Sequence, residues 1–292
     1  MSTYQVKEEL LMDFTEKVLK AYSNIEDPRL KSIVALLIKH LHACVKEMKP
    51  TDEEWEFAWD YMRRMAEITG LERNEFLLFG DVIGVSQLIE TLNHEKPGQP
   101  VGYALVGPFF RANAPFRERG ASTASDDTAG VRVRISGKVY DFQNKTPIKG
   151  AILDTWQAAT NGFYENQDEK QPDYNLRGRF RSDENGTYEV LALMPTAYPA
   201  PTDGPVGELL RVAKRSPYRP AHIHFIVSAP GYETLVTQIF VKGDKRIEDD
   251  VVFTASENMI GDFQKEGDHF RLIYDFPLVP GVSKMPKAPI PA

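Results

Sequence analysis

The spacing of hydrophobic positions changes near residue 100 of this 292-residue chain. Before that point, apolar residues recur every three or four positions, which is typical of amphipathic helices. Thr51 with Glu54 has the pattern of a capping box, and Gly70 is a plausible helix end. The helical pattern covers four stretches: residues 6–23, 28–48, 51–70 and 74–94. These helices are few for the apolar surface they carry, so another domain or a second subunit is expected to complete their core.

After residue 100 the apolar period shortens to two, and the segments become rich in β-branched and aromatic residues. Gly, Pro and Asn-Gly turns separate them. The segments predicted as strands are residues 131–142, 150–158, 186–193, 221–229, 234–241 and 270–279. The sequence therefore predicts an α+β protein, with a helical domain at residues 1–100 and a β-sandwich or barrel at residues 101–292.

Composition and charge narrow the classes of function. The chain is 42% hydrophobic with a formal charge of -7, and it has no long basic cluster, which argues against nucleic-acid binding and favours small-molecule partners. It has neither an export signal nor an apolar run long enough to span a membrane. The single cysteine, Cys44, cannot form an internal disulfide and is predicted to be a buried apolar residue. A cytoplasmic protein is expected.

Two of the six histidines, His222 and His224, stand two positions apart in a predicted strand. Alternation places both on one face, while the other face is apolar and is predicted to point into the core: Ile223, Phe225 and Val227. At about 3.3 Å per residue the two imidazoles leave the backbone roughly 6.6 Å apart, so both can converge on one ion. His-x-His on a strand is thus a possible metal half-site, although two histidines on a solvent-facing strand are also common.

Further ligands would have to be carboxylates or phenolates. The single cysteine is excluded as a ligand. The other histidines have no spacing to a second ligand that would indicate a metal site: His40, His42, His94 and His269. Most of the twelve tyrosines are expected to be core aromatics. Tyr164 and Tyr198 stand in less usual surroundings, the first after a turn and the second in a proline-rich loop that can hold a side chain rigidly.

Three segments together resemble the non-haem ferric intradiol dioxygenases: DTWQA with NGFY (154–164), LMPTAYP (193–199) and RPAHIHFIVSAPGYETLVTQIF (219–240). The similarity runs from about residue 20 to residue 280. Within the family, YPAPTDGPVG (198–207) is most similar to members that cleave hydroxyquinol, benzene-1,2,4-triol. Two departures, Tyr218 before Arg219 and FLLFGD at 76–81, lie beside the expected substrate.

The resemblance implies one Fe(III) per chain, with a hydroxide as a further ligand. The implied protein ligands are Tyr164, Tyr198, His222 and His224. Two phenolates and a hydroxide carry three negative charges, which suit Fe(III). By the same resemblance Tyr164 and His222 would be equatorial, and Tyr198 and His224 axial. Tyr198 would leave the metal and take a proton from the substrate.

The resemblance also implies intradiol cleavage of hydroxyquinol by O2, giving 3-hydroxy-cis,cis-muconate, the tautomer of maleylacetate, in aromatic catabolism. Catechol, giving cis,cis-muconate, is the alternative substrate. Arg219 would stabilise the negative charge that develops on the substrate, and Gln238 would assist it. From the residue types alone, Arg219 would be interpreted as a surface ion-pair residue and Gln238 as an exposed strand residue. The implied ring pocket comprises Leu78, Asp81, Leu105, Val106, Gly107, Pro108, Phe109, Ala200 and Pro201, together with Arg219.

Several alternatives stay open at this point. Asp81 could accept a hydrogen bond from an extra ring hydroxyl or cap a helix, and the apolar pocket residues could be ordinary core. The β domain could be a binding module without catalysis, or a zinc hydrolase that adds Glu165 or Asp173 to the two histidines. The family pairs through its N-terminal helices, which implies a homodimer, and a lipid tail could lie in the apolar cleft between the paired helices.

Overall fold

The computed structural model describes residues 14–70 and 73–290. The chain divides into two compact units between Arg63 and Arg64. Helix α3, Asp52–Glu67, continues across this division. The predicted domain boundary at residues 100 and 101 stays a prediction, and the two units are described in turn.

The first unit is helical. Residues 14–21 are helical, within the stretch predicted at 6–23, whose first eight positions lie outside the described residues. Helix α2, Pro28–Met48, begins at Asp27, whose carboxylate accepts the backbone N–H of Leu30 at 2.8 Å. The predicted capping box at the start of α3 is confirmed, because Thr51 N donates to Glu54 Oε2 at 2.8 Å and Glu54 N to Thr51 Oγ1 at 3.2 Å.

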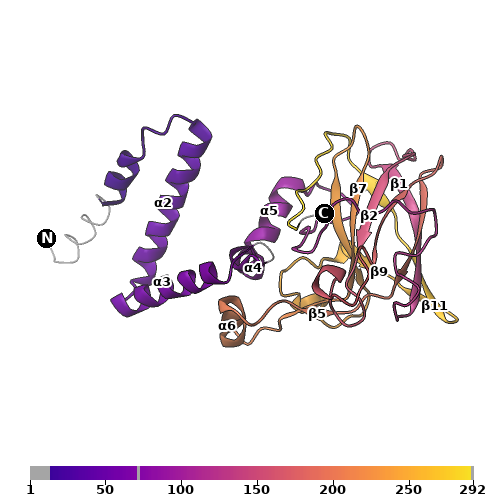
Figure 1. The fold of residues 1–292 in the computed structure, drawn as a ribbon. Coiled ribbons are helices and arrows are strands. Elements are labelled where there is room, and N and C mark those ends of the chain that lie inside the picture. The colour runs from indigo at the N-terminus through magenta and orange to yellow at the C-terminus, as the bar shows by residue number, and fades with distance from the viewer. Residues whose placement is uncertain (1–13, 71–72, 291–292) are drawn as a thin grey trace. The chain divides into compact units, whose positions relative to one another are not determined.

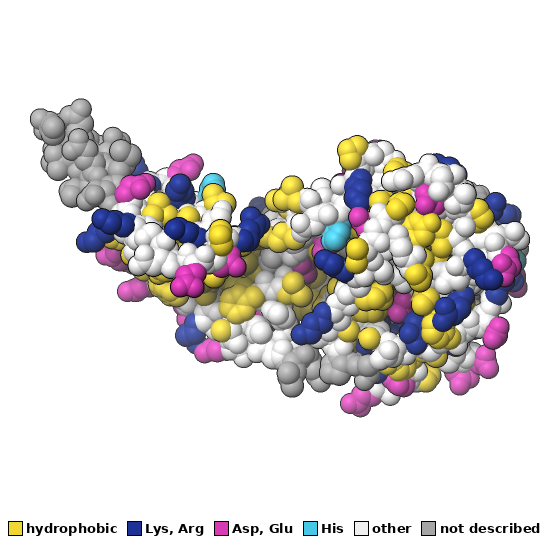
Figure 2. Space-filling model, turned by 90° about the horizontal axis from the view of Figure 1, so that it is seen from above, with side chains coloured by type: hydrophobic (Ala, Val, Ile, Leu, Met, Phe, Trp, Pro, Cys, Tyr) yellow, Lys and Arg dark blue, Asp and Glu magenta, His cyan; other side chains and the backbone are white. Residues whose placement is uncertain are grey.

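Helix α2 buries none of its residues in the single chain. Cys44 on this helix is exposed, so the prediction of a buried cysteine was wrong, because α2 buries none of its residues against the described part of the chain. Hydrophobic side chains, yellow in Figure 2, reach the surface beside charged ones. Among the described residues, no helix combines the length and the apolar character needed to cross a bilayer.

After the end of α3, the second unit has two short helices in place of the single stretch predicted at 74–94. Helix α4 is Glu75–Val82 and helix α5 is Val85–His94. Gly84 between them has a φ of 79°, a left-handed conformation that breaks the helix and that glycine adopts at little cost. Asn74 caps α4 by accepting the N–H of Leu77 at 3.0 Å. The last turn of α4 then carries Asp81.

A β-sandwich follows, as predicted (Figure 1). One sheet has the order β10-β11-β1-β12, with β4 also paired to β1, and the other has the order β3-β2-β7-β8-β9. The first sheet consists of β1 Arg132–Asp141, β4 Thr187–Leu193, β10 Gln264–Glu266, β11 His269–Ile273 and β12 Phe276–Leu278. The second consists of β2 Ile152–Trp156, β3 Arg177–Arg181, β7 His222–Ser228, β8 Leu235–Val241 and β9 Ile260–Gly261.

All six predicted strand segments are found, but the stretch at 270–279 forms two strands, β11 and β12. Strand β3 and helix α6, Pro205–Val212, were not predicted. Two residue pairs, β5 Tyr198–Pro199 and β6 Tyr218–Arg219, form a small separate ladder. Single-turn 3-10 helices lie at Glu165–Gln167, Ile247–Asp249 and Glu257–Met259.

The core lies between the two sheets and fixes which face of β7 remains for a site. Ile223, Phe225 and Val227 are fully buried in this core, as predicted, against Ile135 and other residues of the opposite sheet. Because side chains alternate along a strand, His222 and His224 point to the outer face of the second sheet. His224 pairs in register with Trp156 on one side and Gln238 on the other. The outer face of this sheet therefore carries the candidate site.

Candidate active site

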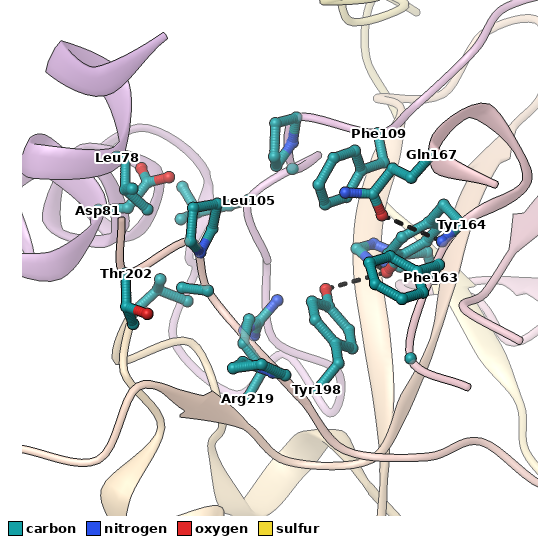
Figure 3. Close-up of a pocket in the computed structure, with 18 of the residues that line it drawn as sticks. Leu78, Asp81, Leu105, Phe109, Phe163, Tyr164, Gln167, Tyr198, Thr202 and Arg219 are labelled. Carbon is teal, nitrogen blue, oxygen red and sulfur yellow. Dashed lines mark hydrogen bonds between the residues drawn. The ribbon is translucent and has the colours of Figure 1, made fainter. Parts of the chain in front are cut away.

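Four side chains that are far apart in the sequence meet on the outer face of β7. Tyr164 Oη lies 3.0 Å from Tyr198 Oη and 3.0 Å from His224 Nε2. His224 Nε2 lies 3.1 Å from His222 Nε2, which is 3.4 Å from Tyr198 Oη. The four contacts close a ring in the order Tyr198, Tyr164, His224, His222, and Figure 3 shows the contact between the two tyrosines.

Local structure positions each donor. Strand β7 supplies both histidines, Tyr198 begins β5, and Tyr164 precedes the 3-10 helix Glu165–Gln167. The backbone N–H of Tyr164 donates to Gln167 Oε1 at 3.1 Å, which holds this turn. Gly162, with a φ of 87°, lets the chain pass Tyr198 closely, since a Cβ at position 162 would lie 3.3 Å from Tyr198 Cβ.

The ring of donors has the dimensions of a metal site. Nitrogen and oxygen ligands bind first-row metals at about 2.0–2.2 Å, so two ligands of one ion lie about 3.0 Å apart at a right angle and about 3.4 Å apart at a tetrahedral angle. The four observed edges span 3.0 to 3.4 Å. The arrangement therefore fits a single metal ion bound by two phenol oxygens and two imidazole nitrogens.

Both imidazoles are uncharged, which is the charge state that binds metals. His222 Nδ1 donates to the carbonyl of Pro220 at 2.7 Å, which leaves the lone pair of Nε2 free in the neutral ring. Burial, reinforced by the charge of Arg219, lowers the pKa of His222 to about 3. Burial and the neighbouring His222 lower the pKa of His224 well below its usual value. His224 stacks on Trp156, with the ring centroids 4.5 Å apart and an angle of 12° between the planes.

The two phenols need a cation to ionise. Burial raises the pKa of Tyr164 well above its ordinary value, and Tyr198 beside it adds to the rise. Burial also raises the pKa of Tyr198, although Arg219 opposes the shift. A metal ion supplies the positive charge that deprotonates such ligands. The chemistry of the donor set therefore agrees with its dimensions.

Arg219 and Gln238 are buried beside the donor ring, with 7% and 0% of their surface exposed, and are not the surface residues that their types alone suggest. Arg219 Nη2 donates to Gln238 Oε1 at 2.9 Å, and Gln238 Nε2 donates to the carbonyl of Leu105 at 3.0 Å. Burial disfavours the charged guanidinium, but Asp250 together with Tyr198 and Tyr164 outweighs this effect and raises the pKa of Arg219. Arg219 is thus a permanent positive charge next to the ring.

A cavity of about 510 Å³ is lined by three of the four donors, Tyr164, Tyr198 and His224. Figure 3 shows Leu78 and Asp81, from α4, on one side of it and Tyr164 with Phe163 on the other. The structure brings every residue of the expected ring pocket to this cavity: Leu78, Asp81, Leu105, Val106, Gly107, Pro108, Phe109, Ala200, Pro201 and Arg219. A volume of this size accommodates a small aromatic ring.

Asp81 is buried in the wall of the cavity, in the last turn of α4, and the N-cap residue of the following helix, α5, is Gly84. Burial raises the pKa of its carboxyl to about 6, while a hydrogen bond to Ser86 and the charge of Arg219 oppose the shift. At pH 7 Asp81 is therefore mostly ionised and can accept a hydrogen bond from a bound molecule.

Part of the cavity wall is held by a residue that sequence reasoning missed. Glu75, with no exposed surface, accepts the backbone N–H of Val206 at 3.1 Å through Oε1. Its Oε2 pairs with Arg73, which also binds Asp203 at 2.8 Å. These contacts tie the segment YPAPTDGPVG to the start of α4. The partners are about 130 positions apart, so no sequence spacing signals them.

Other lining residues were also missed: Trp156, Asn161, Gly162, Phe163, Gln167, Pro199, Thr202, Asp203 and Val252. Most of them flank Tyr164 and Tyr198 within the sequence motifs, so their closeness to these two residues in the sequence could have indicated them. Val252 comes from a distant loop, and no sequence signal indicates it.

The carboxylates proposed for a zinc hydrolase are engaged elsewhere. Glu165 pairs with Arg177 at 2.5 Å and with Arg111 at 2.7 Å, and Asp173 also binds Arg111. Among the described residues, His, Cys, Asp and Glu form no group of three or more that could hold a metal. The donor set at β7 is instead completed by tyrosines, which do not suit a hydrolytic zinc site.

Comparisons with known proteins identify the family. The family model described as "Dioxygenase" matches residues 105–280, and the model "Catechol dioxygenase N terminus" matches residues 27–100. The chain is 43% identical to the hydroxyquinol 1,2-dioxygenase of Rhizobium sp. (strain MTP-10005), over 87% of this chain and 85% of that protein. It is 38% identical to the 6-chlorohydroxyquinol 1,2-dioxygenase of Cupriavidus pinatubonensis, over 92% and 97%.

A solved structure agrees. Hydroxyquinol 1,2-dioxygenase from Pseudomonas putida DLL-E4 matches with a TM-score of 0.88 and 34% identity, covering 94% of this chain and 100% of that chain. The chain therefore belongs to the intradiol ring-cleavage dioxygenases, a family of enzymes, as the sequence motifs indicated. The predicted order of a helical N-terminal region and a sheet-rich C-terminal domain is confirmed.

Proposed function

We propose that this protein cleaves hydroxyquinol between its two adjacent hydroxyl-bearing carbons, with O2, to give 3-hydroxy-cis,cis-muconate, the tautomer of maleylacetate. Both atoms of O2 enter the product. The observation that carries this proposal is the closed ring of two phenol and two imidazole donors, three of which line a cavity that accommodates a small aromatic ring. The named relatives that act on hydroxyquinol or its 6-chloro form support the choice of substrate.

The proposed cofactor is one Fe(III) per chain, held by Tyr164, Tyr198, His222 and His224. When bound, the ferric ion would withdraw electrons from the chelated diol and so make its ring reactive towards O2. The order of the ring puts Tyr198 opposite His224 and Tyr164 opposite His222, so the four donors surround one point where the ion would be held.

The protein's own residues bind and orient the substrate. Tyr198 Oη accepts a proton from the diol, and Arg219 stabilises the negative charge that develops on it, with Gln238 holding the guanidinium. The apolar wall formed by Leu105, Val106 and Phe109 excludes water from the ring. Asp81, on the opposite side of the cavity, accepts a hydrogen bond from the third hydroxyl.

The test is steady-state kinetics of the purified, iron-loaded enzyme with hydroxyquinol and catechol. We expect kcat/KM to be higher for hydroxyquinol, with one O2 consumed per ring and no free peroxide. An equal or reversed preference would favour the alternative, a catechol 1,2-dioxygenase that forms cis,cis-muconate.

We also propose a homodimer that forms through the N-terminal helices. The apolar residues of α2 are exposed in the single chain: Leu30, Ile33, Leu36, Leu37, Leu41, Val45 and Met48. Exposed apolar surface of this extent on one 21-residue helix is typical of an interface. A lipid tail between the paired helices and a cytoplasmic location complete the proposal.

A further inference from the structure

Asp250 contacts Arg219 and accepts two hydrogen bonds from its guanidinium. Asp250 Oδ1 accepts from Arg219 Nε at 3.1 Å, and Oδ2 accepts from Nη2 at 3.0 Å. Such a paired contact fixes both the distance and the plane of a guanidinium. Asp250 is 4% exposed, so solvent screens this ion pair little.

The carboxylate of Asp250 is itself held in place by its own loop. Its Oδ2 also accepts the backbone N–H groups of Thr254 at 3.1 Å and Ala255 at 3.0 Å, and Oδ1 accepts that of Val252 at 3.4 Å. Thr254 Oγ1 donates to Gln87 Oε1 on α5 at 3.0 Å. The loop is therefore anchored to α5, and Asp250 has little freedom to move.

These contacts determine which nitrogen of Arg219 remains for the active site. Nε and Nη2 are engaged by Asp250, and Nη2 is shared with Gln238. Nη1 points to the donor ring instead, 3.4 Å from His222 Nε2. Arg219 lines the cavity, so Nη1 is the guanidinium nitrogen placed to meet a bound diol.

We propose that Asp250 is a positioning residue for ring cleavage, which acts by holding Arg219 so that Nη1 faces the reacting carbons. This inference rests on the proposed function, because it concerns charge that develops on the diol. A misplacement of about 1 Å can cost on the order of 100-fold in rate even when the charge itself is kept. The position of Asp250, and not only its charge, is therefore expected to matter.

Asp250→Glu tests this directly, since it keeps the charge and moves the carboxylate by one methylene. We expect kcat to fall on the order of 10- to 100-fold while KM changes less than about threefold, because the interaction is made mainly in the transition state. The dissociation constant for hydroxyquinol, measured without O2 from the change in the visible spectrum, should stay within about threefold of wild type. Iron content should be unchanged.

Asp183 offers a matched control. Its carboxylate also accepts backbone N–H groups from its own loop, of Asn185 and Thr187, and also pairs with an arginine, Arg119, but it lies outside the cavity. Asp183→Glu should leave kcat and KM as in wild type. A kcat for Asp250→Glu that equals the kcat of this control would overturn the proposal.

A double-mutant cycle separates action through Arg219 from a general structural effect. In an Arg219→Gln background, Asp250→Glu should lower kcat by less than about twofold further, since its target is already gone. Equal losses in both backgrounds, or failure of Asp250→Glu to fold or to retain iron, would show a structural role and contradict the inference. Wild-type enzyme without ring-cleavage activity would instead contradict the proposed function itself.

Discussion

His222 and His224 turn their Nε2 atoms to within 3.1 Å of each other, although their backbones leave a strand two residues apart. The hydrogen bond from His222 Nδ1 to Pro220 and the stacking of His224 on Trp156 hold the two rings in this orientation. The convergence is explained if one ion lies between them and the two tyrosines.

Tyr198→Phe tests the proton acceptor. The variant should retain its fold, because the ring remains, but should lose at least about 100-fold in kcat, within the range that general base catalysis contributes. Steady-state kinetics and circular dichroism are the measurements. Tyr188→Phe is the control, since Tyr188 is also buried but donates to the carbonyl of Tyr274, away from the cavity. It should lose about 1 kcal/mol of stability and no activity. Full activity in Tyr198→Phe would remove this residue from the mechanism.

Asp81→Ala tests the acceptor for the third hydroxyl. A site that hydrogen-bonds a substrate hydroxyl discriminates strongly against the analogue without it, whereas an apolar pocket separates such pairs by only about 10- to 200-fold. We expect the ratio of kcat/KM for hydroxyquinol over catechol to fall at least tenfold, by about 1.4 kcal/mol. An unchanged ratio would assign the preference to other residues.

The state of Asp81 also predicts how the preference depends on pH. Burial raises the pKa of its carboxyl to about 6, so the ionised acceptor is present above pH 6 and is lost as the pH falls through that value. The ratio of kcat/KM for the two substrates should therefore be higher at pH 7.5 than at pH 5.5. In Asp81→Asn this difference should disappear. A wild-type ratio that is constant over this range would argue against an ionised Asp81 as the acceptor.

Asp154 predicts a pH dependence of stability. It lies on β2, and burial raises the pKa of its carboxyl to about 7, although Arg179 and Arg177 oppose the shift. In the unfolded chain the pKa of this carboxyl is near 3.9, so the unfolded chain releases the proton at a lower pH than the folded protein does. The folded state therefore loses stability as the pH rises from about 4 to 7. Asp154→Asn should remove this loss and gain on the order of 2–3 kcal/mol relative to wild type between pH 5 and pH 8.

Urea unfolding of both proteins at the two pH values measures this difference. Asp183→Asn is the control: hydrogen bonds from Thr187 hold the pKa of Asp183 below its usual value, so its contribution is already complete at pH 5. Its stability relative to wild type should not change between pH 5 and pH 8. The same constancy in Asp154→Asn would mean that Asp154 is ionised in the folded protein throughout.

The exposed face of α2 predicts the oligomeric state. Light scattering should give the mass of two chains for the wild type. Leu37→Asp combined with Leu41→Asp places charge on the apolar face and should raise the dimer dissociation constant by at least about 100-fold, or about 2.7 kcal/mol. Lys39→Asp on the same helix should leave the dimer intact, because residue 39 is on the polar side. A monomeric wild type, or a dimeric double variant, would exclude α2 as the interface.

Local patterns were sufficient to predict much of the fold. The alternation around His222 predicted which face of β7 enters the core, and Thr51 with Glu54 predicted the start of α3. Strand β3 was missed because two of its alternating positions are arginines, Arg177 and Arg179. Both depend on partners from other elements: Arg177 pairs with Glu165, and Arg179 donates to the carbonyl of Ala114. Alternation of apolar residues, the signal for a half-buried strand, is absent there.

The site residues also fall into those that the sequence predicted and those that it did not. Family motifs pointed to the four donors and to Arg219, and the structure brings these residues together. Asp250 and Glu75 were missed, because each acts on a residue 31 or 131 positions away and neither belongs to a motif. Ion pairs that form only in the folded chain leave no periodic signal in its sequence.

The iron content and visible spectrum of the purified protein test the central claim most directly. The donor set predicts one Fe(III) per chain and a broad visible absorption from charge transfer between tyrosinate and iron, which should disappear in Tyr164→Phe with Tyr198→Phe and on removal of the iron. A colourless protein without iron, which cannot be reconstituted with iron, would contradict the proposed metal centre and the ring cleavage that depends on it.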